Sequence, residues 1–276
     1  MANNILKKTL LSSALGLMLG FQGMQDAAAT TVSYVESNIY GPDYFVSSGN
    51  VELSFDLISY GAIASANGVT DPGSYHESFF GFGNVAEVGD YFTDPASSYA
   101  ISNSEGFEPF YDYVFSEAAT DSSLGADLTG EASAASFLTY SFTAMGTGIL
   151  DLFAPYEYYL DVTTGAGDCG YAESTGLMSV ALNGGEASSG PHAHSMGSCN
   201  GSDYPIAYGY EDLALTLSLE DGATGTITIL TTAFASYFPD VVALPLPASS
   251  GMLLLGLLML LALRRRNNGN LTGTAA

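Results

Sequence analysis

The two cysteines and two of the histidines have types and a spacing that could do chemistry. Cys169 and Cys199 enclose His192 and His194 in the order Cys-x22-His-x-His-x4-Cys. Thiolates and imidazoles are preferred zinc ligands, so one interpretation is a zinc site. The other is a disulfide between the cysteines, with the histidines in a solvated loop beside a Gly-Pro pair. Because the spacing matches no zinc pattern that we can name, we predict the disulfide.

Two glycine-containing strings imitate catalytic or cofactor motifs. Residues 197–201 read Gly-Ser-Cys-Asn-Gly, like the turn that carries a hydrolase nucleophile, and residues 165–170 contain Gly-x-Gly-x-x-Gly. Both motifs require a helix directly after the glycines, and neither segment is followed by a helical pattern. We therefore interpret both strings as loops in a β protein.

Acidic residues dominate the charge of the chain. There are 29 Asp and Glu, of which only Asp26 precedes residue 30, and no Lys or Arg lies between Lys8 and Arg264. Nucleic-acid binding depends on such cations and is excluded for this segment, and phosphate-handling enzymes are disfavoured for the same reason. Calcium is the cofactor that these oxygen ligands favour, but no EF-hand string is present and no metal site is assigned.

Carbohydrate chemistry stays open as an alternative. Carboxylate pairs can cleave glycosidic bonds, and 28 acids after residue 29 offer many pairs. The chain has no Trp, so stacking on a sugar would depend on tyrosines such as Tyr156, Tyr158 and Tyr159. We interpret these three as strand residues that alternate between core and surface.

Alternation with a period of two predicts strands that would position all these residues. It is clearest at residues 51–57 and 213–219, and the second run is followed by Glu-Asp-Gly-Ala-Thr-Gly and a Thr- and Ile-rich run at 226–230. The Asp-Gly pair predicts a hairpin there. Weaker strands are predicted at residues 111–115, 137–143, 149–154, 156–162 and 177–182.

The small-residue stretch 117–136 shows no clear alternation and is predicted as a surface loop, a short helix or a boundary between sheets. Short strands separated by Gly and Ser favour an all-β fold. We predict an antiparallel β-sandwich, jelly-roll-like, over residues 30–240, flanked by a cleavable N-terminal signal helix and a C-terminal transmembrane helix.

The basic residues mark both ends of the chain. Lys7 and Lys8 precede an apolar run that ends in small residues, which predicts a signal peptide over residues 1–29 with cleavage at Ala27-Ala28-Ala29. At the other end, Pro245, Leu246, Pro247 and Ala248 lie in the motif segment 241–248. We predict a minimal transmembrane helix over residues 249–263. It is followed by a basic cytoplasmic tail over residues 264–276, which contains Arg264, Arg265 and Arg266.

The order of Pro-Leu-Pro-Ala, short apolar helix and arginine cluster resembles the PEP-CTERM class of sorting signals, and more narrowly its Val-Pro-Leu-Pro-Ala variant. The resemblance is limited to about residues 244–266. It implies a Gram-negative bacterium, recognition by an exosortase-type membrane protease, cleavage near the proline motif, and delivery to the cell surface or to an exopolysaccharide matrix.

These patterns together predict a non-enzymatic exported protein. It would be anchored in the inner membrane before processing, and its acidic surface would contact extracellular polysaccharide through divalent cations, without nucleic-acid partners. The alternatives are a secreted hydrolase that acts on polysaccharide and a calcium-dependent carbohydrate-binding module.

Overall fold

The computed structural model describes residues 31–78, 81–88, 98–106, 112–122, 129–165, 167–182, 185–201 and 206–239. These residues form thirteen antiparallel strands, and the described ranges contain no helix. The strands are β1 (Val32–Tyr40), β2 (Asp43–Ala66), β3 (Val69–Asp71), β4 (Ser74–Ser78), β5 (Gly81–Val88), β6 (Ser98–Gly106), β7 (Tyr113–Asp121), β8 (Gly130–Thr163), β9 (Asp168–Leu182), β10 (Gly185–Ser188), β11 (His192–Cys199), β12 (Ile206–Leu219) and β13 (Thr224–Pro239).

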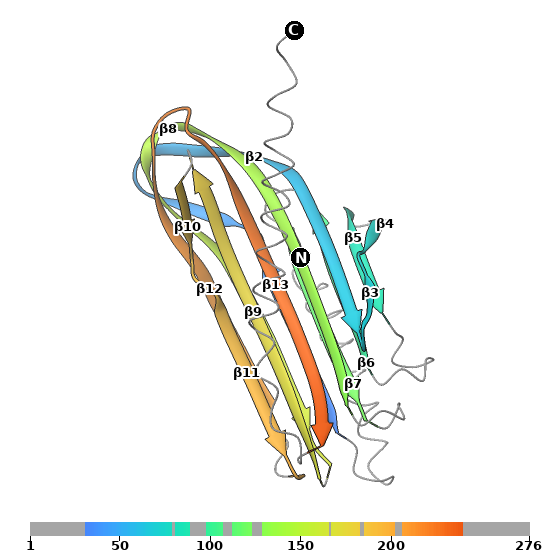
Figure 1. Cartoon of the computed structure of the whole chain (residues 1–276). Helices are drawn as coiled ribbons and strands as arrows, with labels where there is room; N and C mark the ends of the chain where they lie inside the picture. The colour runs from blue at the N-terminus through green and yellow to red at the C-terminus, as the bar shows by residue number, and fades with distance from the viewer. Residues whose placement is uncertain are drawn as a thin grey trace, which may run out of the picture.

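The strands belong to one hydrogen-bonded sheet that folds over on itself, so that two layers face each other as in a β-sandwich (Figure 1). One layer contains β3, β9, β10, β11, β13, the first half of β8 and the second half of β2. The other contains β1, β4, β5, β6, β7, β12, the second half of β8 and the first half of β2. The prediction of an all-β antiparallel fold is confirmed.

The centre of the fold is β8, a strand of 34 residues that passes through both layers. Its first half pairs with β13, its second half pairs with β12 and β1, and β2 follows it through the bend. The three weaker strands predicted at 137–143, 149–154 and 156–162 are therefore parts of one bent strand. Figure 1 shows β2 and β8 curving over together at one end of the molecule.

Glycines allow the paired strands to bend at this end. Gly146 of β8 and Gly49 of β2 have positive φ angles of 91° and 83°, which L side chains rarely adopt. A Cβ atom at Gly146 would collide with the carbonyl oxygen of Asn50 on the paired strand, and one at Gly49 would collide with that of Thr147. The bend therefore depends on two residues without side chains.

The predicted hairpin after residue 219 is wrong. Strands β12 and β13 pair with successive halves of β8, and no described pairing joins them to each other. The Asp-Gly turn instead connects β12 in one layer to β13 in the other, beside the bend of β8. Gly146 N donates to Asp221 Oδ1 at 2.7 Å, and Gly222 N donates to Ala144 O at 2.9 Å.

The interior narrows from the bend towards the opposite end. Near the bend it contains large side chains, among them Tyr140, Tyr156, Leu138, Leu150, Met178, Ile227 and Ile229. At the opposite end the buried positions are mostly alanines, including Ala62, Ala64, Ala118, Ala132, Ala134, Ala172, Ala233 and Ala235. Cα atoms of β7 and β13 approach within 8 Å, closer than the roughly 10 Å of ordinary facing sheets.

This thin end explains why the stretch at 117–136 lacks alternation. Its described residues belong mainly to β7 and β8, where alanine and serine face the interior because larger side chains do not fit. Buried hydroxyls join the layers there. Ser116 Oγ donates to Thr231 O at 3.2 Å, Ser136 Oγ donates to Phe115 O at 2.9 Å, and Ser37 Oγ contacts Thr231 Oγ1.

A buried tyrosine also connects the two layers. Tyr140 of β8 is 1% exposed, and its hydroxyl donates to the carboxylate of Asp112, which is 1% exposed and precedes β7. Burial, together with the nearby Asp112 charge, raises the pKa of Tyr140 well above its ordinary value, so the hydroxyl keeps its proton. The carboxylate thus has a charge-assisted donor from the opposite layer.

We expect Tyr140→Phe to lower the free energy of unfolding by about 1.5 to 3 kcal/mol, because a buried carboxylate loses a hydrogen bond. Urea unfolding followed by circular dichroism measures the loss. Tyr208→Phe is the control, since that tyrosine is 80% exposed and should change stability little. Equal stability of the two variants would show that the buried contact contributes nothing.

Candidate functional site

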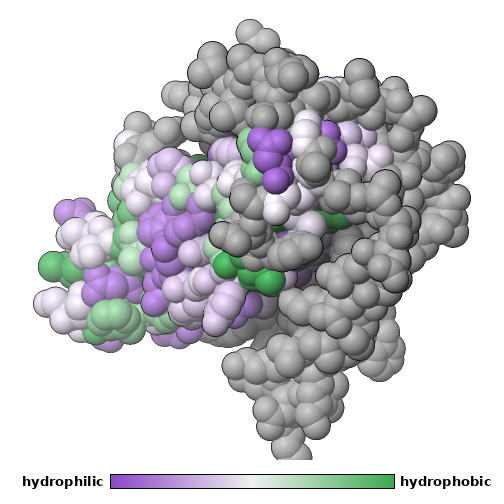
Figure 2. Space-filling model, turned by 90° about the horizontal axis from the view of Figure 1, so that it is seen from below, coloured by the Kyte–Doolittle hydropathy of each residue, from purple (hydrophilic) through white to green (hydrophobic). Residues whose placement is uncertain are grey.

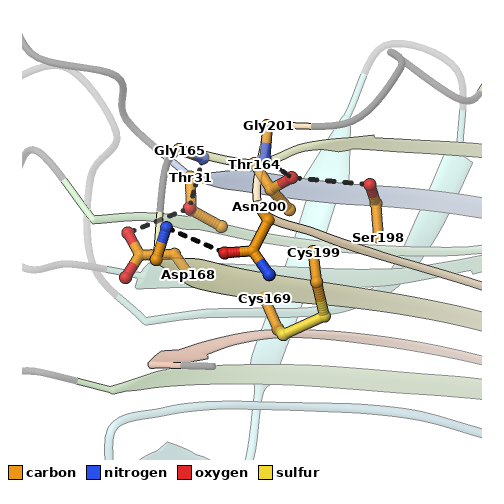
Figure 3. Close-up of a disulfide and its surroundings, with 10 residues drawn as sticks. Thr31, Thr164, Gly165, Asp168, Cys169, Ser198, Cys199, Asn200 and Gly201 are labelled. Atoms are coloured by element: carbon orange, nitrogen blue, oxygen red, sulfur yellow. Dashed lines mark hydrogen bonds between the residues drawn. A yellow bond between two sulfur atoms is a disulfide. The ribbon is translucent and has the colours of Figure 1, made fainter. Parts of the chain in front are cut away.

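Cys169 and Cys199, for which the disulfide was predicted, are joined in the structure (Figure 3). They are register partners on the antiparallel strands β9 and β11, with an S–S distance of 2.00 Å and a Cα–Cα distance of 4.1 Å. The bond closes a sequence separation of 30 residues. Sulfur atoms bonded to each other are not thiolate ligands, so the zinc interpretation that uses both cysteines does not fit this arrangement.

Hydrogen bonds hold the loops beside the disulfide. Asn200, at a positive φ of 61°, donates from its backbone N to Asp168 O at 2.9 Å and accepts from Gly167 N at 3.1 Å. Thr31 Oγ1 donates to Asp168 Oδ2 at 3.1 Å and accepts from Gly165 N at 2.9 Å (Figure 3). The prediction that both glycine strings are loops is only partly right, because residues 168–170 belong to β9 and residues 197–199 belong to β11.

The two histidines lie in strand β11, so their predicted position in a solvated loop is wrong. Both point towards one carboxylate, that of Glu211 on β12. His192 Nδ1 is 2.6 Å from Glu211 Oε2, and His194 Nε2 is 3.1 Å from Glu211 Oε1. We call these three residues the His-Glu-His clasp. Among the described residues, no group of three or more His, Cys, Asp or Glu is arranged to hold a metal ion.

The clasp joins two edge strands that belong to different layers. Strand β11 pairs with β9 in one layer, whereas β12 pairs with β8 in the other. The ring of His194 stacks on that of Tyr158, with centroids 3.8 Å apart and planes 11° from parallel. The hydrogen bond with His192 lowers the pKa of Glu211, against the opposing effect of partial desolvation.

We expect the stabilising effect of Glu211 to depend on pH. A carboxyl whose pKa is lowered by folding contributes fully above its unfolded pKa, about 4.3 for glutamate, and loses the contribution as the pH falls through the folded pKa. The stability difference between the wild type and Glu211→Gln should therefore be present near pH 6 and disappear below about pH 4. Urea unfolding at several pH values measures it.

Glu52→Gln is the control for this experiment, because Glu52 is exposed on β2 and its removal changes net charge by the same amount. A difference between wild type and E211Q that stays constant with pH would contradict the electrostatic role of the clasp. It would indicate that Glu211 acts through packing alone.

A second group of residues, made up of tyrosines and carboxylates, lies on the outer face of the layer that contains β12. Tyr208 and Tyr210 of β12 are 80% and 58% exposed. Their register partners on β8 are Tyr159 and Glu157, and Ile206 is opposite Asp161. We define the tyrosine face as the side chains of Tyr159, Tyr208, Tyr210, Glu157, Asp161 and Asp212.

The tyrosine face has carboxylates and no Lys or Arg, and these negative charges affect the pKa values of its tyrosines. Burial and then the charge of Asp161 raise the pKa of Tyr159 to about 12. Desolvation followed by the charge of Asp212 raises the pKa of Tyr210. Desolvation also raises the pKa of Asp161, partly opposed by a hydrogen bond with Tyr159. Tyr159 and Tyr210 therefore keep their hydroxyl protons at neutral pH and lie in a negative potential.

No protein-family model matches the chain, and no curated protein matches it. What the molecule does therefore has to be inferred from its own residues.

The predicted processing residues lie outside the described residues. This applies to Ala27 and Ala29 of the signal cleavage site, to the sorting motif Pro245, Leu246, Pro247 and Ala248, and to Arg264, Arg265 and Arg266. The described ranges contain no helix with the length and apolar character needed to cross a membrane. The predicted transmembrane helix at 249–263 lies beyond those ranges, and both signals stay predictions.

The sequence-based reasoning missed Glu211, Tyr208 and Tyr210. The run from Ile206 to Tyr210 alternates large side chains with Ala and Gly, which was an available strand signal. The pairing of Glu211 with two histidines joins residues about twenty positions apart and had no local signal. Tyr156, Tyr158 and Tyr159 are strand residues as predicted, with Tyr156 buried and the other two partly exposed.

Proposed function

We propose that this chain is an exported, non-enzymatic protein of the cell surface or of an exopolysaccharide matrix. In this proposal a signal peptide directs export, and an exosortase-type protease recognises the tail, whose apolar helix anchors the chain in the inner membrane before processing. The exported part is the acidic β-sandwich, and we propose that its strands have a jelly-roll-like topology.

One sequence observation carries the proposal. The Pro-Leu-Pro-Ala motif, an apolar run and three arginines follow one another at the end of a chain whose acidic body contains no Lys or Arg. The disulfide between Cys169 and Cys199 supports it, because such bonds form and persist in oxidising compartments outside the cytoplasm.

Intact mass spectrometry of the protein from fractionated cells tests this proposal. We expect loss of residues 1–29 and cleavage near residues 245–248, with the product in the surface or matrix fraction. A variant with Pro245 and Pro247 changed to alanine should stay in the membrane fraction. Recovery of the uncut chain with reduced cysteines from the cytosol would refute the proposal.

The proposed working surface is the set of exposed carboxylates. They lie on several strands and turns and include Glu52, Asp56, Glu87, Glu131, Asp212, Glu220 and Asp221. Like charges without counter-charges repel one another, so bound divalent cations should stabilise the fold and bridge it to acidic polysaccharide. Calcium suits carboxylate oxygens in variable geometry.

We expect Ca²⁺ at millimolar concentration to raise the melting temperature by several degrees more than NaCl at the same ionic strength. Differential scanning calorimetry measures the shift, and Mg²⁺ tests ion preference. Equal effects of Ca²⁺ and matched NaCl would show that screening alone acts, and would remove the proposed cation bridge.

A second candidate is a carbohydrate-binding module, which the exposed pair Tyr208 and Tyr210 favours. Aromatic faces beside hydrogen-bonding groups can stack on sugar rings. Saturable binding of a defined glycan, without turnover, would support this candidate, whereas turnover would indicate the hydrolase alternative.

A further inference from the structure

The tyrosine face combines exposed aromatic rings with an open strand edge. Tyr208 and Tyr210 are two residues apart on β12, so their positions are separated by about 7 Å along the strand. Strand β12 pairs with β8, and no other described strand pairs with its second edge. An extended ligand could therefore lie along the two rings without displacing a strand.

Carboxylates surround these rings, and no basic side chain offsets them. Asp212 interacts with Tyr210, Glu157 is opposite Tyr210 on β8, and Asp161 interacts with Tyr159. The whole described part of the chain contains no Lys or Arg. The surface seen from below has a band of hydrophilic residues beside separate hydrophobic ones (Figure 2).

Charge complementarity selects among the sugars that could stack here. An anionic polysaccharide would be repelled unless cations intervene, and a neutral one would gain stacking alone. A sugar that carries an ammonium group would gain cation–π attraction to tyrosine and charge-assisted hydrogen bonds to carboxylates. The combination of exposed rings and unbalanced acids therefore favours a cationic sugar over the other two.

We propose that the tyrosine face binds a polysaccharide with free amino groups, of the glucosamine-polymer class. This inference rests on the proposed function, because it requires an exported protein that meets extracellular polysaccharide. It differs from the cation bridge in its partner, since here the sugar itself supplies the positive charge. Asp212 and Glu157 would bind the ammonium groups, and Tyr208 and Tyr210 would stack on the rings.

Isothermal titration calorimetry of the full chain in mild detergent, with glucosamine hexasaccharide at about pH 5.5, tests the proposal. We expect saturable binding that weakens with added salt and is at least tenfold tighter than binding of the N-acetylated hexasaccharide. The double variant Y208A/Y210A should weaken binding about tenfold, and Asp212→Asn should weaken it several-fold.

A matched variant separates this site from general attraction to an acidic protein. Tyr75→Ala removes a tyrosine that is 61% exposed on β4, outside the tyrosine face and outside the exposed carboxylates. This variant should bind like the wild type, and circular dichroism confirms that every variant is folded. The inference is overturned if the two hexasaccharides bind equally, if the amino form does not bind, or if Tyr75→Ala weakens binding as much as the face variants.

The surface-protein proposal and the proposal of amino-sugar binding by the tyrosine face can be refuted independently. If cells export and process the protein but glucosamine hexasaccharide does not bind, only the assignment of the tyrosine face fails. If the hexasaccharide binds as expected but the uncut chain is cytosolic, the surface-protein proposal fails, and with it the biological role assigned to this binding.

Discussion

Replacement of Cys169 and Cys199 by serine is expected to lower the free energy of unfolding by about 3 to 4 kcal/mol. The disulfide closes a loop with a sequence separation of 30 residues, and its removal returns chain entropy to the unfolded state. It also ties β11 to β9, and β11 has no second strand partner among the described pairings. Urea unfolding without reductant measures the loss.

Reduction of the wild type provides the matched control. Dithiothreitol should reproduce the loss in the wild type and leave the double serine variant unchanged, because the variant has no bond to reduce. If the wild type and the variant unfold at the same urea concentration, hydrogen bonds around Asp168 and Asn200 hold this end of the sheet, and the disulfide adds nothing.

Gly146→Ala should cost about 2 to 5 kcal/mol, as the sum of two penalties. Its φ of 91° is unfavourable for any residue with a Cβ atom, which costs about 1 to 2 kcal/mol. The added Cβ would also collide with the carbonyl oxygen of Asn50, and backbone displacement of this kind costs about 1 to 3 kcal/mol. Chemical denaturation of the purified variant gives the total.

Gly167→Ala separates the two penalties. Gly167 has a similar φ of 85°, but a Cβ atom there would meet nothing within 4 Å. It should therefore show the conformational penalty alone, and the difference between the two variants measures the collision at the bend. If both variants lose the same stability, the close approach of β2 and β8 is not what requires glycine.

The bend matters beyond its local strain because β2, β8 and the β12–β13 segment all pass through it. These strands connect the two layers, so a backbone shift at Gly146 disturbs the neighbouring pairing of β8 with β2 and the contacts with the turn at Asp221 and Gly222. The His-Glu-His clasp lies between β11 and β12, and its alignment depends on these contacts. Damage at the bend should consequently also weaken the interaction of Glu211 with His192 and His194.

Alternation with a period of two was enough to predict the strand at residues 213–219, where one face is buried and the other is exposed to solvent. Leu213, Leu217 and Leu219 are buried and Leu215 is partly buried, whereas Ala214, Thr216 and Ser218 are exposed. The alternation failed at 117–136, because alanine and serine face both the thin interior and the surface there. It also divided β8 into three strands, because Gly146, Gly148 and Pro155 look like breaks in a sequence.

The amino-acid sequence by itself determined the all-β class, the one-sided charge and the cysteine pair available for a disulfide. These are properties of composition and of near neighbours along the chain. Only the tertiary structure decided that the Asp-Gly turn connects the two layers, that Glu211 meets two histidines, and that Tyr208 and Tyr210 lie among carboxylates. Those contacts depend on how β8 bends and which strands pair with each half, and pairing between distant segments is set by the whole sheet.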